Sequence, residues 1–211
     1  MTRISASILG FYFDAKKNKQ KTEEMIKDIN DALAKKDSEF DILHLDIEDG
    51  KFVKQKSFKP SEIRKIKCLK KKEAHFMVLN YKKYLKDFFP LADMFIFHNE
   101  IIKHDFPKTI EFLKKNHKFI GISINPNTPL SELKYLDKIN LVLIMSVYPG
   151  LPGQKFIETS LRKIRKLKEI GEKKGLRFAI EVDGGVNNDN KKKIIDAGAD
   201  ILVMGRGFFN A

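Results

Sequence analysis

The sequence predicts an α/β protein built as one closed (β/α)8 barrel, the TIM barrel, and three observations support this. Eight short apolar runs alternate strictly with longer amphipathic segments along the 211 residues. The runs are nearly continuous in Val, Ile, Leu and Phe, which is typical of parallel strands covered on both faces. Eight repeats favour a closed barrel over an open, doubly wound sheet. No linker rich in Gly, Ser or Pro divides the chain, so residues 1–211 are predicted to form a single domain.

The elements follow in chain order from these runs. The predicted strands are residues 3–9, 40–47, 73–79, 92–98, 118–124, 141–147, 177–183 and 199–205. Segments with helical periodicity follow the first seven, at residues 21–36, 59–71, 81–89, 106–116, 128–138, 157–175 and 188–198. Four of them carry terminal signals: Ser61 as an N-cap, Thr128 followed by a first-turn Pro129, and Gly175 and Gly198 as C-caps. Six residues follow the last strand, so the final helix is expected to be short or missing.

The composition describes a lysine-rich protein. The formal net charge is +13, from 35 lysines and 6 arginines against 28 acidic residues. The lysines are spread over every helical segment without a zinc-finger or aromatic RNA-binding pattern, so a nucleic-acid partner is not expected. A positive field would instead speed the arrival of a phosphorylated substrate.

Compartment signals are few. No apolar run reaches the ~18 residues that a membrane span requires, and the N-terminus lacks the pattern of a secretory signal peptide. Cys68 is the one cysteine of the chain, so no internal disulfide is possible. We therefore expect a cytoplasmic protein without a membrane partner.

Ionisable side chains interrupt the apolar strands. His44 and Asp46 lie two residues apart and therefore share one face of their strand. His75 lies in the next strand, His98 ends the fourth, and Asp183 ends the seventh. Two imidazoles and two carboxylates at the C-terminal end of such a barrel suit Zn²⁺, Fe²⁺, Mn²⁺ or Co²⁺. From the residues alone, a set of hydrogen-bonded core side chains stays open as the alternative.

Glycine-rich turns follow the last three strands. Backbone N–H groups approach an anion closely where side chains are absent, and loops at this end of such barrels commonly hold phosphate. Ordinary tight turns are the alternative, but the clustering at one end of the barrel favours an anion site. The glycines concerned are Gly150, Gly153, Gly184, Gly185 and Gly205.

Several motifs together resemble one family. The chain carries, in order, SASIL, HLDIEDGKFV, AHFMV, NPNTPL, LIMSVYPGLPGQKFI, IEVDGGVN and AGADILVMG. The most specific are H-x-D-x-x-D-G at residues 44–50 and MSVxPGxxGQxFI at residues 145–157. This set resembles the ribulose-phosphate 3-epimerases over nearly the whole chain. The resemblance implies a homo-oligomeric enzyme that interconverts D-ribulose 5-phosphate and D-xylulose 5-phosphate in the pentose phosphate pathway.

The resemblance also implies residue roles. One divalent cation, Zn²⁺ or Fe²⁺ before Mn²⁺ or Co²⁺, would bind His44, Asp46, His75 and Asp183. Asp46 and Asp183 would be the acid/base pair, since inverting a carbon beside a carbonyl needs one proton removed on one face and one returned on the other. The implied substrate contacts are Ser7, His75, Met77, Met145, Gly150, Gly153, Asp183, Gly184, Gly185 and Gly205. Arg206 is added to them for its charge, although it departs from the family pattern.

Four positions depart from the family pattern. Glu48 stands where methionine is usual, so it either charges one wall of the site or points outward. Pro152 stands where glycine is common and removes a backbone N–H from the phosphate loop. Arg206 replaces a small hydroxyl residue and would add positive charge. Lys51 replaces a common histidine.

Two other functions stay open. An epimerase acting on a six-carbon ketose phosphate such as allulose 6-phosphate would have nearly the same site. A degenerate barrel that binds phosphosugar or nucleic acid without catalysis is the second, motivated by the charge, Pro152 and the short C-terminus. A decarboxylase of the same superfamily is disfavoured, because Glu48 stands where those enzymes have a lysine.

Overall fold

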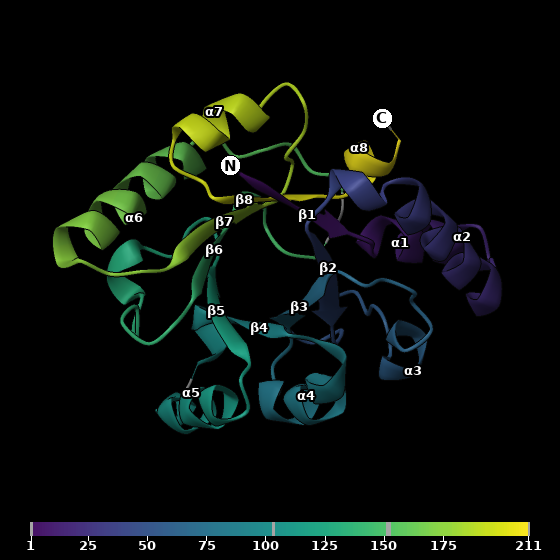
Figure 1. Ribbon diagram of the computed structural model, residues 1–211, viewed down its shortest axis with the longest axis horizontal. Helices are drawn as coiled ribbons and strands as arrows, with labels where there is room; N and C mark the ends of the chain where they lie inside the picture. Colours follow the sequence, from purple (N-terminus) through teal and green to yellow (C-terminus); the bar gives the residue numbers. More distant parts are fainter. Residues whose placement is uncertain (1, 103, 151–152, 211) are drawn as a thin grey trace.

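The computed structural model describes residues 2–102, 104–150 and 153–210, which form a closed barrel of eight parallel strands and confirm the predicted fold class. The strands are β1 (Arg3–Ser7), β2 (Ile42–Glu48), β3 (Lys71–Met77), β4 (Met94–His98), β5 (Phe119–Ile124), β6 (Leu141–Met145), β7 (Ala179–Asp183) and β8 (Ile201–Met204). Each strand pairs with its neighbour in sequence, and β8 closes on β1. The strands form the centre of the molecule and the helices surround them (Figure 1).

Helices of very different length cover the barrel. They are α1 (Leu9–Lys17), α2 (Thr22–Lys35), α3 (Pro60–Ile63), α4 (Tyr81–Phe88), α5 (Phe106–Lys115), α6 (Ser160–Lys174), α7 (Lys191–Asp196) and α8 (Arg206–Phe209). Four 3-10 turns lie between them in the described residues: η1 (Asp37–Glu39), η2 (Phe89–Leu91), η3 (Asn99–Ile101) and η4 (Leu130–Glu132). Gly175 ends α6 in the left-handed conformation with φ 62°, as predicted. None of the helices in the described ranges is long and apolar enough to cross a membrane.

Helix α1 was not predicted from the sequence. It follows β1 directly, where the apolar pattern suggested the tail of a strand. Its buried residues are Gly10, which has no side chain, and Ala15, which has only a methyl group. Together they leave no apolar stripe that a helical period would reveal. The helix packs beside α2 (Figure 1), and Leu9 and Gly10 at its start line the pocket described below.

Two predicted helices are much shorter than expected. In residues 59–71 only α3 forms, and it begins at Pro60 after the N-cap Lys59, so Ser61 is not the cap. The predicted range also extends into β3, because Lys71 already pairs with Ile42 in the barrel. Residues 128–138 contain only η4, and Tyr135, with φ 61°, adopts a left-handed conformation that an α-helix cannot continue through.

The final helix is short, as predicted, and the barrel still closes. Four residues of β1 pair with β8, from Arg3 with Ile201 to Ala6 with Met204. The single turn of α8 adds two aromatic contacts, with ring centroids 6.1 Å apart for Phe208 and Phe40 and 5.1 Å apart for Phe209 and Phe11. The pairing of β8 with β1 therefore closes the barrel, and these aromatic rings pack beside that junction.

Alternation along the strands separates two environments. On β2, Leu43, Leu45 and Ile47 join the main core beneath the helices, whereas His44 and Asp46 have the opposite parity and face the barrel interior. Apolar side chains of the interior form a second cluster beside these polar ones. Its buried members are Ile42, Ile96, Leu141, Leu143, Met145, Val147, Ile201 and Val203. The barrel interior therefore combines polar site residues with an apolar cluster, and Met145 of that cluster pairs directly with Asp183.

Candidate active site

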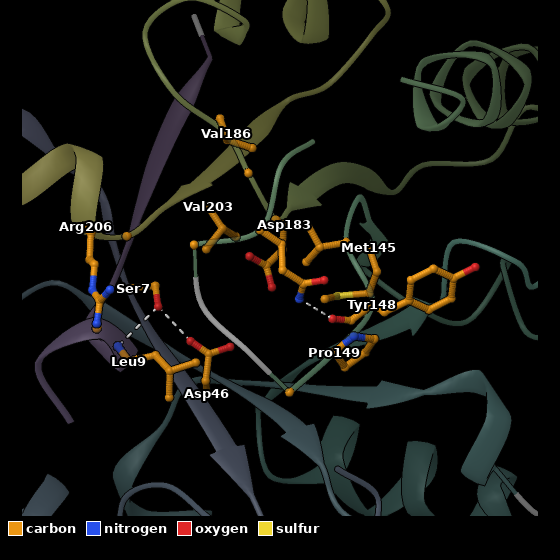
Figure 2. A pocket seen from close by; sticks show the side chains of 18 of the residues that line it. Ser7, Leu9, Asp46, Met145, Tyr148, Pro149, Asp183, Val186, Val203 and Arg206 are labelled. Carbon is orange, nitrogen blue, oxygen red and sulfur yellow. Dashed lines mark hydrogen bonds between the residues drawn. The ribbon is translucent and has the colours of Figure 1, made fainter. Parts of the chain in front are cut away.

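A pocket opens at the C-terminal ends of the strands and collects most of the predicted site residues. Of those, it is lined by Ser7, Asp46, Met77, Met145, Gly150, Gly153, Asp183, Gly184, Gly185, Gly205 and Arg206. His44 and His75 have no exposed surface and lie beneath the pocket. The carboxyl groups of Asp46, from β2, and Asp183, from β7, approach the pocket from opposite sides (Figure 2). Pro152 lies outside the described residues.

Four side chains converge at the base of this pocket. His44, Asp46, His75 and Asp183 each offer one ligand atom, and these atoms lie within 4.8 Å of one another. Asp46 Oδ1 lies 3.4 Å from His44 Nε2 and 3.5 Å from His75 Nδ1. His75 Nδ1 also lies 3.8 Å from Asp183 Oδ2. The strand register explains this, because Asp46 pairs directly with His75 across β2 and β3.

The histidine nitrogens that face this centre show that the residues fit a cation. His44 Nε2 and His75 Nδ1 are buried and have no hydrogen-bond partner among the described residues. A buried, unpaired polar atom is costly unless something outside the chain satisfies it. Two imidazole nitrogens and two carboxylate oxygens at this separation are compatible with a divalent metal ion.

A second group of polar residues lies directly below His44. Glu73 Oε1 accepts a hydrogen bond from His44 Nδ1 at 2.8 Å and one from the Ser5 hydroxyl at 2.5 Å. Glu181 is fully buried beside it, and burial followed by the charge on Glu73 raises the pKa of Glu181 well above its usual range. No role was predicted for Glu73 or Glu181 from the sequence. The available signal was parity: Glu73 and Glu181 each precede an identified site residue by two positions on the same strand.

Asp46 and Asp183 have opposite electrostatic environments. Burial alone would raise the pKa of Asp46, but His44 and His75 overcome this and hold it well below its usual range. Burial and then the charge on Asp46 raise the pKa of Asp183 to about 7. Asp46 is therefore ionised at neutral pH, whereas Asp183 is poised to gain or lose a proton.

The turn after β7 depends on its glycines. Gly184 and Gly185 have φ values of 115° and 66°. A Cβ on Gly185 would lie 2.4 Å from the Phe156 backbone nitrogen, so the loop after β6 fits against this turn only because no side chain is present. The Ser146 hydroxyl donates to the carbonyls of Asp183 and Gly184, at 2.9 and 2.6 Å, and holds the turn in place.

The opening of the pocket contains an unexpected carboxyl group. Glu48 is 3% exposed and lines the pocket, so the outward orientation considered from the sequence is excluded. Neither of its carboxyl oxygens has a hydrogen-bond partner in the part of the chain that the structure describes. Burial and then the charge on Asp46 raise the pKa of Glu48 to about 8.

Asp49 and Arg206, two further polar residues near Glu48, are each bound to other parts of the protein. Asp49 ends β2 by accepting hydrogen bonds from the backbone N–H groups of Lys51, Phe52 and Leu79, at 2.7, 2.8 and 2.8 Å. Lys51 enters this network through its backbone and its side chain is exposed. Arg206 lines the pocket, and its guanidinium is paired with Asp14 of α1. Its charge is therefore partly neutralised.

The fold and the site define a (β/α)8-barrel enzyme with two facing carboxyl groups over a centre compatible with a divalent cation. The chain belongs to the ribulose-phosphate 3-epimerase family, whose model matches residues 4–209. A ribulose-phosphate 3-epimerase of Buchnera aphidicola is 37% identical over 81% of this chain and 78% of that protein. One from Bacillus subtilis is 33% identical over 99% of this chain and 93% of that protein. The protein is accordingly an isomerase of the epimerase class.

Solved structures share the fold at much lower identity. The 3-hexulose-6-phosphate synthase of Salmonella typhimurium aligns with a TM-score of 0.65 and 14% identity, over 99% of this chain and 91% of that one. A mutant tryptophan synthase α-subunit from Pyrococcus furiosus aligns with a TM-score of 0.66 and 16% identity, over 100% of this chain and 91% of that one. At this identity the likeness confirms the barrel alone.

Proposed function

We propose that the protein interconverts D-ribulose 5-phosphate and D-xylulose 5-phosphate by two-base proton transfer at C3. The observation that carries the proposal is the placement of Asp46 and Asp183 on opposite sides of one pocket with pKa values shifted in opposite directions. Membership of the epimerase family supports it.

The two carboxyl groups divide the reaction. In one direction, ionised Asp46 removes the C3 proton from one face, and the electron pair moves toward the C2 carbonyl to give a planar ene-diolate. Protonated Asp183 then delivers a proton to the opposite face of C3, and the carbonyl re-forms. In the reverse direction the roles exchange, so each carboxyl group is a base for one epimer and an acid for the other.

We further propose that His44, Asp46, His75 and Asp183 hold one divalent cation, with Zn²⁺ or Fe²⁺ suiting the mixed nitrogen and oxygen donors before Mn²⁺ or Co²⁺. When bound, the cation would polarise the substrate carbonyl and offset the negative charge of the ene-diolate. Asp46 would then be both a cation ligand and a base. Its Oδ1 faces the histidines, and its Oδ2 accepts a hydrogen bond from the Ser7 hydroxyl at 2.7 Å.

The remaining pocket residues would bind and orient the sugar phosphate. The turns at Gly150, Gly153, Gly184, Gly185 and Gly205 give backbone N–H groups access to the phosphate. Arg206 would contribute charge, shared with Asp14. Met77 and Met145 give the pocket apolar walls against which the ketose carbons pack. A homo-oligomeric state and a cytoplasmic location stay predictions.

One experiment tests this proposal. Purified protein is assayed with D-ribulose 5-phosphate, with and without a chelator, and its bound metal is quantified. We expect turnover that chelation abolishes and that Zn²⁺ or Fe²⁺ restores. A parallel assay with allulose 6-phosphate distinguishes the six-carbon alternative. Absence of both turnover and bound metal, with steeply salt-dependent nucleic-acid binding, would instead identify a non-catalytic barrel.

A further inference from the structure

The two histidines of the metal centre point opposite ring nitrogens toward it. His44 faces the centre with Nε2, and Glu73 accepts from its Nδ1 directly. His75 faces the centre with Nδ1, and its Nε2 lies 3.0 Å from Nε2 of His98 on β4. A second imidazole, rather than a carboxylate, therefore lies behind His75.

The hydrogen-bond chain continues beyond His98. Its Nδ1 lies 3.2 Å from Glu100 Oε2, and both His75 and His98 are completely buried. A nitrogen that binds a cation must offer its lone pair, so His75 must carry its proton on Nε2. His98 Nε2 must then accept that proton's hydrogen bond, so His98 carries its own proton on Nδ1 and donates to Glu100. One arrangement of protons satisfies all three groups.

Glu100 is held in place from its other side. Its Oε1 accepts from the Asn125 backbone N–H at 2.9 Å and from the Thr128 hydroxyl. The Lys163 ammonium of α6 donates to three carbonyls of the same loop, those of Asn125, Pro126 and Thr128, at 3.0, 2.8 and 2.7 Å. The loop after β5 therefore fixes the carboxylate that orients His98.

We propose that His98 and Glu100 are positioning residues that hold His75 in the Nε2–H tautomer, which keeps its Nδ1 available to the cation. This series of hydrogen bonds runs from the loop after β5, outside the pocket, to the cation ligand His75. Residues that touch neither substrate nor cation would therefore determine the cation affinity. This inference rests on the proposed metal site.

Replacing Glu100 with glutamine tests the proton arrangement without changing the shape of the side chain. The Asn125 N–H and the Thr128 hydroxyl require an acceptor, so the amide oxygen of the variant will face them. Its NH₂ group then faces His98 Nδ1, which must become an acceptor. His98 Nε2 consequently gains the proton, and His75 must move its own proton to Nδ1, where it blocks the cation.

Two readouts follow from Glu100→Gln. In metal-free protein, nitrogen-15 NMR of the ring nitrogens should show His75 as Nε2–H in the unchanged chain and Nδ1–H in the variant; the chain has five histidines, which simplifies assignment. Zn²⁺ affinity, measured by competition with a chelating dye, should fall by about 10- to 100-fold. His98→Phe keeps an aromatic ring but removes the acceptor, and it should lower affinity similarly.

The matched control is Thr128→Val, which removes one donor to Glu100 Oε1 and leaves the His98 contact intact. Its Zn²⁺ affinity should stay within about twofold of the unchanged chain. The proposal is overturned if Glu100→Gln leaves the His75 tautomer unchanged, or if Glu100→Gln and His98→Phe both bind Zn²⁺ as the unchanged chain does. If the unchanged protein binds no Zn²⁺, that result counts against the proposed function. The NMR spectrum of the metal-free protein still tests whether His98 and Glu100 set the tautomer of His75.

Discussion

The Asp46 and Asp183 sides of the site differ in what surrounds the carboxyl group. Asp46 lies between two buried histidines and the Ser7 hydroxyl, and its side chain is 5% exposed. Asp183 ends β7 at a glycine turn, and its side chain is 17% exposed with one histidine contact. The same functional group therefore has a lowered pKa on one side and a raised one on the other. In the proposed mechanism, the surroundings rather than the residue type would decide which carboxyl group is ionised and which is protonated at the start of a turnover.

The largest expected effect comes from removing either carboxylate. Asp46→Asn and Asp183→Asn preserve shape but lose the proton-transfer group, so kcat should fall at least ~10³-fold in each variant. Steady-state kinetics in both directions measures this, and circular dichroism checks that the fold persists. Turnover at the normal rate by both variants would contradict the division of roles.

A change behind Asp183 should act on that side alone. In Gly185→Ala the new Cβ would lie 2.4 Å from the Phe156 backbone nitrogen at a residue with φ 66°, so the turn must shift. We expect a stability loss of about 1–3 kcal/mol, with a higher KM for the sugar phosphate. Gly153→Ala is the control, because φ is also positive there but no atom of the described residues lies within 4 Å of the new Cβ. Equal losses in both variants would show that the close contact is unimportant.

Removing the Ser7 hydroxyl should weaken the Asp46 side slightly. Ser7 Oγ donates to Asp46 Oδ2 at 2.7 Å (Figure 2), and this hydrogen bond favours the ionised carboxylate. Ser7→Ala should therefore lower kcat/KM by about 5- to 10-fold, the equivalent of one hydrogen bond of roughly 1 kcal/mol. Kinetics in both directions measures the loss. A decrease as large as that of Asp46→Asn would mean that Ser7 itself takes part in proton transfer.

The smallest effect concerns stability and its dependence on pH. Glu48 has its pKa raised to about 8 from an ordinary 4.5, so the folded chain holds this proton more tightly than the unfolded chain. Between these pH values only the unfolded form loses the proton, and folding stability falls as pH rises. Glu48→Gln removes this loss of stability. The Tm of the variant minus the Tm of the unchanged protein, both without metal, should therefore increase from about pH 4.5 to about 8 and then stay constant. We expect this difference to reach at least about 2 °C.

Thermal melts across this pH range check the Glu48 prediction. Glu172→Gln, at an exposed position on α6, is the control and should leave Tm unchanged. A gain in Tm for Glu48→Gln that is the same at every pH would point to packing rather than to the carboxyl proton.

The sequence predicted what depends on pattern and missed what depends on three-dimensional neighbours. The eight strands and the convergence of His44, Asp46, His75 and Asp183 follow from parity and strand order, which determine which side chains face inward. Helix α1 was missed because its small buried residues leave no stripe. Glu73 shares the inward parity of His75, but parity alone does not reveal its contact with His44, 29 positions away.

The most direct test of the two-base account follows the proton itself. The unchanged enzyme is incubated with D-ribulose 5-phosphate in deuterated water, and C3 of the first-turnover product is examined by NMR or mass spectrometry. Two carboxyl groups on opposite faces predict that the D-xylulose 5-phosphate carries solvent deuterium at C3 while unreacted substrate keeps its proton. Product that retains the substrate's own C3 proton would show one group working on both faces and would contradict the account.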